Sequence, residues 1–130
     1  MSDPLAQICA DDALRERGVG VRFEIERNAT RIPCFAVRFN GVAVAYINRC
    51  THLPMELDWN AGKFFDFDDA HLICSTHGAL YDPATGVGRG GPCRGVGLEP
   101  VAIVERDRAI WLRHDRLAAP KLAPLPASTP

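Results

Sequence analysis

Two short motifs, each holding one cysteine and one histidine, constrain this chain more than any other feature. The first is Cys50-Thr51-His52 and the second is Cys74-Ser75-Thr76-His77. Each follows a strand-like run, residues 42–47 before the first and residues 71–73 before the second. Two thiolates and two imidazoles can therefore meet at one point from two loops. That donor set suits a tetrahedral zinc ion or an iron–sulfur cluster with mixed ligands.

The order of the donors favours the cluster. A Cys2His2 zinc finger supplies its cysteines as one pair and its histidines as the next, whereas each loop here has one of each. If both cysteines reach one iron and both histidines the other, the two loops hold a [2Fe–2S] cluster from two sides. A structural zinc site remains the alternative.

The sequence around these motifs resembles the Rieske ferredoxin family. The matching stretches are Cys50-Thr51-His52-Leu53, Cys74-Ser75-Thr76-His77-Gly78, Tyr81-Asp82-Pro83-Ala84-Thr85-Gly86 and Gly91-Pro92. The likeness covers about residues 46–104 and extends more weakly over the chain to Arg113. It implies that Cys50, His52, Cys74 and His77 bind a Rieske-type [2Fe–2S] cluster. It also implies that His52 and His77 face solvent at the docking point, with Cys50 and Cys74 deeper.

Alternation and turn residues predict an all-β domain. Residues 21–27 alternate apolar and charged side chains, which is typical of a half-buried strand. Asn40-Gly41 predicts a tight hairpin between strands at 34–39 and 42–47. We expect residues 28–33 to form a turn, and residues 98–105 and 109–113 to form a closing hairpin. The family resemblance implies stacked antiparallel sheets, with a small inserted cluster-binding sheet that carries the two ligand loops.

The 130 residues suffice for one domain. We expect a single Rieske-type domain over residues 1–116, with its cluster-binding part at about 47–94. Residues 117–130 are rich in alanine and proline, which is typical of a flexible tail.

Charge and hydropathy exclude several classes of partner. The net charge is -1, so no strong field attracts nucleic acid or a membrane surface. The N-terminus shows no basic and apolar segments of a signal peptide, and no stretch approaches the roughly 18 apolar residues of a membrane helix. We therefore expect a cytoplasmic protein that binds neither nucleic acid nor membrane.

Three of the five cysteines are left over from the proposed ligand set. An odd count argues against a disulfide framework. Cys9 and Cys34 lie in apolar runs and are expected to be small buried residues, whereas Cys93 follows Gly91-Pro92 in the loop that covers the cluster in the family. We expect the Cys93 side chain to have a packing role and not a redox role.

The segment of 21 residues between His52 and Cys74 is acidic and aromatic. Its acids are Glu56, Asp58, Asp66, Asp68 and Asp69. We interpret it as a solvated loop whose aromatic side chains pack inward. An acidic lip beside the cluster is the alternative.

Three positions set an expectation for the reduction potential. High-potential family members carry an extra cysteine in each ligand loop and a serine just after the second motif. Here the corresponding residues are Met55, Thr76 and Ala79. Fewer hydrogen bonds then reach the sulfur atoms, so the potential is expected near the low end of the Rieske range.

These features predict an electron carrier and not an enzyme. The resemblance implies a one-electron carrier that binds a flavoprotein reductase and a terminal oxygenase transiently. From the length we do not expect a terminal oxygenase subunit, which needs a second, iron-binding domain. The alternatives are the small subunit of an assimilatory nitrite reductase and a zinc-stabilised binding module with no redox role.

Overall fold

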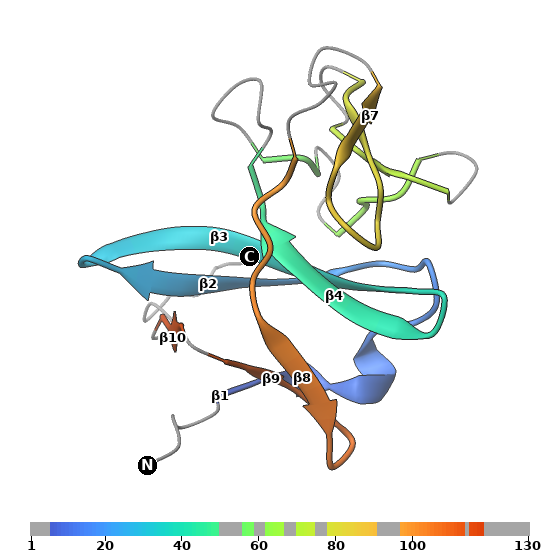
Figure 1. Ribbon diagram of the computed structural model, residues 1–130. Helices are drawn as coiled ribbons and strands as arrows, with labels where there is room; N and C mark the ends of the chain where they lie inside the picture. Colours follow the sequence, from blue (N-terminus) through green and yellow to red (C-terminus); the bar gives the residue numbers. More distant parts are fainter. Residues whose placement is uncertain are drawn as a thin grey trace, which may run out of the picture.

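The protein folds into three small antiparallel sheets, one above another (Figure 1). The computed structural model describes residues 6–49, 56–58, 62–66, 70–74, 78–90, 97–113 and 115–118. The lower sheet contains β1 (Ala6–Ala10), β9 (Ala109–Leu112) and β8 (Ile103–Arg106), in that spatial order. The middle sheet contains β10 (Arg116–Leu117), β2 (Val21–Arg27), β3 (Thr30–Phe39) and β4 (Val42–Ile47). The upper sheet contains β5 (Leu72–Ile73), β6 (Leu80–Tyr81) and β7 (Gly88–Gly90).

This architecture confirms the predicted fold class. Two sheets form the base, and the third is an insert between β4 and β8 in the chain. Helix is confined, in the part of the chain that the structure describes, to the single turn η1 (Asp11–Ala13). No helix within those residues has the length and apolarity to cross a bilayer.

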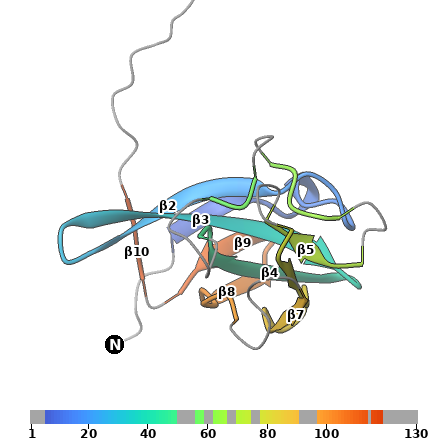
Figure 2. The same ribbon diagram turned by 90° about the horizontal axis from the view of Figure 1, so that it is seen from above.

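The centre of the middle sheet is buried on both faces because Cys34–Val37 of β3 and Ala45–Ile47 of β4 are apolar without interruption. On β3, Cys34 and Ala36 pack toward the lower sheet, whereas Phe35 and Val37 belong to the core beneath the upper sheet. Side chains alternate across a strand, so a continuous apolar run serves two cores at once. Figure 1 shows β3 and β4 between the other two layers, and the view from above shows β5 and β7 at the end of the middle sheet away from β10 (Figure 2). The upper sheet is thereby mounted on a rigid base.

The β3–β4 hairpin forms where the sequence predicts it. Asn40 and Gly41 adopt φ values of +54° and +80°, the left-handed conformation that a type I′ turn requires at both positions. The hairpin aligns Cys34 with Ile47 and Phe39 with Val42. It therefore delivers the chain to the first ligand motif at the end of β4.

The expected turn at residues 28–33 is wrong for its last four residues. Only Asn28 and Ala29 form the turn, with φ values of 51° and 62°. β3 begins at Thr30, which pairs with Arg27 at the end of β2, and the antiparallel pairing continues to Val21 and Ala36. Pro33 is tolerated because it lies beyond the end of the β4 ladder, where its carbonyl accepts the Asn48 N–H at 2.8 Å.

Three other stretches differ from expectation. Gly88–Gly90, for which the sequence predicts no strand, forms β7 and pairs with β6, and the strand expected from Leu98 begins only at Ile103. Leu117, at the expected start of the tail, belongs to β10 and pairs with Ile25 of β2. Residues 119–130 lie outside the described residues, so the tail itself stays a prediction.

Candidate metal centre

The second motif lies at the tip of the β5–β6 hairpin. β5 and β6 pair Leu72 with Tyr81 and Ile73 with Leu80. Beyond the ladder, the Cys74 N–H donates to the Ala79 carbonyl at 2.9 Å, and the Gly78 N–H donates to the Cys74 carbonyl at 2.8 Å. These bonds close a short loop from Cys74 to Ala79, in which His77 precedes Gly78.

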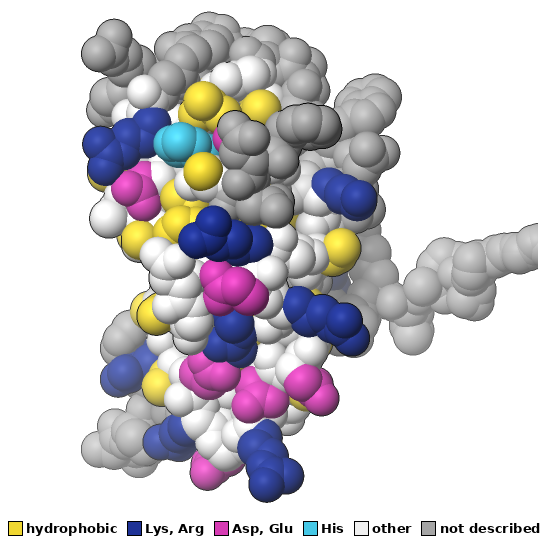
Figure 3. All heavy atoms as spheres, turned by 90° about the vertical axis from the view of Figure 1, so that its right-hand side faces the viewer, with side chains coloured by type: hydrophobic (Ala, Val, Ile, Leu, Met, Phe, Trp, Pro, Cys, Tyr) yellow, Lys and Arg dark blue, Asp and Glu magenta, His cyan; other side chains and the backbone are white. Residues whose placement is uncertain are grey.

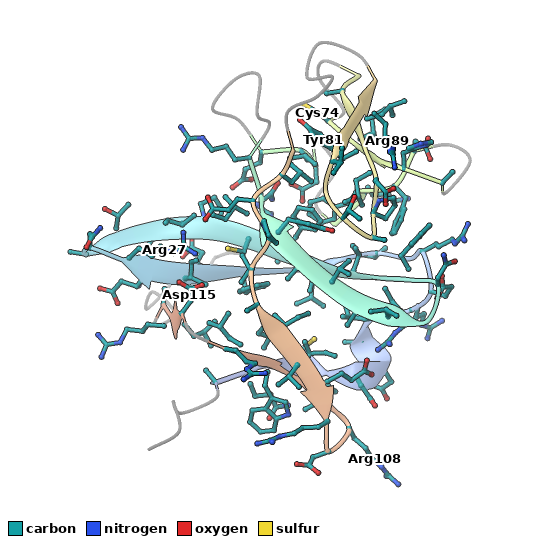
Figure 4. All side chains as sticks on the ribbon, viewed as in Figure 1. Arg27, Cys74, Tyr81, Arg89, Arg108 and Asp115 are labelled. Carbon is teal, nitrogen blue, oxygen red and sulfur yellow. The ribbon has the colours of Figure 1, made fainter. Side chains whose placement is uncertain are left out.

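Cys74 is completely buried at the start of this loop. It belongs to the upper core, together with Phe35, Leu57, Ala79 and Tyr81. Figure 4 shows Cys74 and Tyr81 in the part of the molecule that β5, β6 and β7 build. A thiolate buried at a loop tip is a suitable soft ligand for iron or zinc. The surroundings of Cys74 therefore fit a sulfur-ligated metal group.

Of the four residues that the sequence assigns to the cluster, only Cys74 is described by the structure. Cys50, His52 and His77 lie outside the described residues, and so do Cys93, Met55 and Thr76. The residues that are described contain no group of three or more metal-ligating side chains. The four-residue ligand set thus stays a prediction, with Cys74 as its described member.

Ala79 and Tyr81 line the core next to Cys74. Both side chains are fully buried. Ala79 presents a methyl group where the high-potential pattern has a hydroxyl, so it can donate no hydrogen bond to sulfur. Tyr81 has the largest of the fully buried side chains in the described residues, which makes its ring a wall of the upper core.

The first ligand loop begins at a buried asparagine. Asn48 follows β4 directly, precedes Cys50 by two positions and has an exposed fraction of 1%. Its side-chain oxygen accepts the Leu57 N–H at 2.9 Å, and its amide nitrogen donates to Asp58 Oδ1 at 3.0 Å. The loop is therefore joined at its base to the segment that follows it.

Asp58 corrects the expectation of a solvated acidic loop. Its side chain has an exposed fraction of 0% and accepts the Gly62 N–H at 2.9 Å as well as the Asn48 amide. The Arg22 Nε lies 3.3 Å from Asp58 Oδ2, and an Arg22 terminal nitrogen donates to Glu56 at 2.7 Å. A buried carboxylate needs such partners to offset its lost hydration. Asp58 is therefore a structural residue that connects three segments, and it does not belong to an acidic surface beside the cluster.

Asp66 is also a structural residue of this segment. Its Oδ1 accepts the N–H groups of Ala70 and His71 at 3.0 and 3.2 Å, and its Oδ2 lies 3.5 Å from His71 Nδ1. Asp66 thus binds the two residues that directly precede β5. The inward packing of aromatic side chains is confirmed for Phe64, which is fully buried, whereas Asp68 and Asp69 lie outside the described residues.

The turn between β6 and β7 lies against Tyr46 of β4 in the middle sheet. Asp82 Oδ1 accepts the Ala84 and Thr85 N–H groups at 2.8 and 3.4 Å. The Arg89 guanidinium, with its nitrogen 3.0 Å from Asp82 Oδ2, holds the pKa of this carboxyl below its usual value. Gly86 closes the turn with φ of +80°, where a Cβ would lie 2.7 Å from Tyr46 Cε1. Only glycine fits this conformation so close to the Tyr46 ring.

Tyr46 and the returning chain connect this turn to the base. The Tyr46 hydroxyl donates to the Pro83 carbonyl at 2.7 Å, and its burial raises the pKa of Tyr46 to about 12. The Leu98 N–H donates to the Gly86 carbonyl at 2.7 Å, and the Ile47 N–H to the Glu99 carbonyl at 2.9 Å. Both ends of the segment that contains Gly91-Pro92 are therefore anchored.

The cysteines outside the motifs behave as expected where they are described. Cys34 is buried with an exposed fraction of 1%, and burial raises its pKa to about 12. Cys9 is half-buried beside the core between the lower and middle sheets, and burial raises the pKa of its thiol as well. Both are free thiols. Neither is positioned as a reactive thiolate.

The described residues on one face of the molecule show no dominant charge (Figure 3). On the face that Figure 3 shows, basic and acidic side chains are interspersed and do not gather by sign. This agrees with the net charge of -1. Long-range steering by a single-sign field is therefore not a feature of this face.

Sequence reasoning missed the roles of Asn48, Asp58 and Arg22. Their interactions cross 10 to 34 residues of chain, as the bonds from Asn48 to Asp58 and from Arg22 to Glu56 show. One signal was present, because Asp58 stands alone between the large apolar residues Leu57 and Trp59. An acid in such a position is a candidate for burial with partners.

Comparison with known proteins gives one family match. A model of the Rieske [2Fe-2S] domain family matches residues 6–113. No curated protein matches the chain at the sequence level.

Solved structures share the fold. The ferredoxin of carbazole 1,9a-dioxygenase from Nocardioides aromaticivorans IC177 superposes with a TM-score of 0.67 at 21% identity, covering 85% of this chain and 98% of that one. The ferredoxin of Sphingomonas yanoikuyae B1 gives 0.65 at 18% identity, over 85% and 99% of the two chains. A complex of reduced oxygenase and oxidised ferredoxin in carbazole 1,9a-dioxygenase gives 0.65 at 18% identity, over 86% and 94%.

Proposed function

This chain belongs to the Rieske [2Fe–2S] domain family, and from that premise we propose that it is a one-electron carrier that passes electrons from a flavoprotein reductase to a terminal oxygenase. The observation that carries the proposal is the family match over residues 6–113, nearly the whole folded part of the chain. The cofactor of this family is a Rieske-type [2Fe–2S] cluster, which when bound accepts and releases a single electron.

We assign the cluster to Cys50 and Cys74 on one iron and to His52 and His77 on the other. The complete burial of Cys74 beside Tyr81 supports the assignment, because the thiolate is kept from solvent and oxidants. The anchored base of the first loop supports it further, since Asn48 holds the chain two residues before Cys50. The protein's own contribution is to hold these four side chains and to exclude water from the sulfur side.

The likeness to stand-alone ferredoxins supports a carrier over an enzyme. This chain covers 98% of one such ferredoxin, so the shared fold accounts for that entire protein. We propose that catalysis takes place in the partner and that the carrier acts in the cytoplasm.

The partner assignment rests on a structural neighbour. That neighbour is a complex between an oxygenase and a ferredoxin of carbazole 1,9a-dioxygenase. By analogy, we propose a transient complex between this protein and the oxygenase of its own system, with the histidine side of the cluster at the contact. Weak redox complexes bury small interfaces, below about 1,200 Å².

Electron paramagnetic resonance of the dithionite-reduced protein tests the ligand assignment. Changing any one of Cys50, His52, Cys74 and His77 to alanine should abolish the Rieske-type signal. Cys9→Ala is the matched control, because it also removes a thiol but in the lower sheet, and it should leave the signal intact. A wild-type signal from any of the four ligand variants would refute the assignment.

Stopped-flow mixing tests the carrier role. Protein reduced by an NADH-dependent flavoprotein reductase should transfer one electron per molecule to a Rieske oxygenase from the same source. Reduced protein that no oxygenase reoxidises, but that a nitrite reductase flavoprotein subunit binds stably, would favour the nitrite reductase alternative.

A further inference from the structure

We propose that the buried carboxylate of Asp58 tunes the reduction potential of the cluster downward, with Arg22 as its partial counter-charge. The inference depends on the proposed assignment of the cluster to the two ligand loops. Asp58 is not one of the four residues to which we assign the cluster. Asp58 is therefore a tuning and positioning residue.

The hydrogen bonds around Asp58 suit a carboxylate. Its Oδ1 receives the Asn48 amide at 3.0 Å, and its Oδ2 receives the Gly62 N–H at 2.9 Å, with Arg22 Nε 3.3 Å away. All three partners are donors. An ionised carboxylate is an acceptor only, so it matches these three groups, whereas a protonated carboxyl would turn its own O–H toward a donor.

Asp58 is close to the cluster-binding loops on two sides. Asn48, to which it is bonded, precedes Cys50 by two residues, or less than about 8 Å of chain. On the other side, Leu57 belongs to the same buried core as Cys74. The carboxylate is therefore on the order of 15 Å or less from the first cysteine, counting two residues of backbone and one side chain on each partner.

The two charges of the Asp58–Arg22 pair are not equally screened. The Asp58 side chain has an exposed fraction of 0%, whereas that of Arg22 is 45%. Arg22 also shares its charge with Glu56, to which its terminal nitrogen donates at 2.7 Å. Solvent and Glu56 weaken the positive charge more than the negative one, so a net negative potential remains on the cluster side.

That residual field opposes reduction. Adding one electron from an electrode raises the negative charge of the site by one and breaks no bond. A fixed negative charge destabilises the reduced form more than the oxidised form. At an effective dielectric constant of about 20 and a separation of about 15 Å, one charge changes the reduction equilibrium by about sixfold. For one electron this corresponds to about 45 mV.

Protein-film voltammetry of the cluster-loaded protein tests the inference with three variants. Asp58→Asn removes the charge with little change of shape and should raise the potential by about 45 mV. Arg22→Gln removes the counter-charge and should lower it, by about twofold in the equilibrium constant or about 18 mV. Arg108→Gln is the matched control, since it removes the same charge from the opposite end of the molecule from Cys74 (Figure 4), and it should leave the potential unchanged.

Hydrogen exchange separates electrostatics from loosening of the loop. In Arg22→Gln the Gly62 N–H still donates to Asp58, so its exchange should stay as slow as in the wild type. A lowered potential with protected Gly62 supports the proposal. The proposal is overturned if the Asp58→Asn potential stays at the wild-type value or falls, or if Arg22→Gln shifts no more than Arg108→Gln.

The outcomes remain distinct if a variant fails. Should Asp58→Asn not retain the cluster, the difference between Arg22→Gln and Arg108→Gln decides the question alone. A wild-type protein without a Rieske-type signal would overturn the cluster assignment and this inference together. A wild-type protein with the signal, but with three unshifted variants, would overturn only the role of Asp58.

Discussion

Phe64 joins the cluster-binding part to the base, and its removal should make the protein unfold much faster. The Phe64 ring is fully buried and stacks on Phe35 of β3, with ring centroids 3.9 Å apart and planes 10° apart. Its carbonyl accepts the Ile73 N–H at 2.8 Å, at the start of the β5–β6 hairpin. The ring also fills the space above Gly20, where a Cβ would lie 2.7 Å from Phe64 Cδ2. Phe64→Ala would therefore leave a cavity between the middle and upper sheets.

The magnitude follows from this burial. Truncating a buried phenylalanine to alanine costs about 3–5 kcal/mol, a large share of the 5–15 kcal/mol that stabilises a typical domain. A bound cluster makes equilibrium unfolding a poor measure, so the rate of unfolding is the better quantity. If about 70% of the cost appears in the unfolding barrier, unfolding accelerates about 30- to 400-fold.

Unfolding at a fixed urea concentration, followed by circular dichroism, measures this rate. Phe64→Leu should give an intermediate acceleration, because it leaves a smaller cavity. Val42→Ala, in β4 of the middle sheet, is the control, because Val42 has an exposed fraction of 59%. The unfolding rate of this variant should stay within about twofold of wild type. An unfolding rate for Phe64→Ala within about threefold of wild type would mean that the ring does not hold the two parts together.

Four further predictions concern the potential, the docking surface and alkaline stability. The wild-type potential should lie near -150 mV, and Ala79→Ser should raise it in voltammetry if the new hydroxyl reaches sulfur; a wild-type value above about +100 mV would contradict the expected lack of donors. Leu53→Glu, at a position outside the described residues, should slow electron transfer to the oxygenase in stopped-flow mixing, and an unchanged rate would place the docking surface elsewhere. Neutralising Asp68 and Asp69 together should alter the salt dependence of that rate while the potential barely moves; a large potential shift would place them beside the cluster. Burial raises the pKa of Cys34 from 9.0 to about 12, so folding favours the neutral thiol: this contribution is complete below pH 9 and is lost as pH rises through 12. Cys34→Ala should therefore flatten the decline of the thermal midpoint over this range, and an equally steep decline would rule out the thiol as its cause.

Local sequence patterns predicted most of the strands because their causes are local. The alternation of residues 21–27 and the Asn40-Gly41 pair depend only on neighbours in the chain, and both appear as expected in β2 and in the β3–β4 turn. The continuous apolar run of β3 also predicted a strand, but it did not show why the strand is apolar on both faces. The two faces of β3 are buried because the lower sheet packs on one and the upper sheet on the other. The sequence of β3 alone does not identify those two sheets.

Pairing decided the boundaries that the sequence placed wrongly. Thr30–Pro33 has the composition of a turn, yet it extends as strand because β2 offers it a complete ladder. Gly88–Gly90 has no intrinsic preference for extended structure, but it pairs with β6 as β7. In both places the partner strand overrides a weak local preference.

The sequence by itself determined the family, the all-β class and the identity of the four ligand candidates, because cysteine and histidine spacing is chemistry that the chain carries with it. Tertiary structure alone decided which polar groups of the described segments are buried. Asp58 looks like its acidic neighbours in the sequence, and it becomes a buried clasp only because Asn48, Gly62 and Arg22 bring three donors to one carboxylate. The cost of burying a charge is offset only by partners in space, and those partners come from segments that only the folded chain brings together.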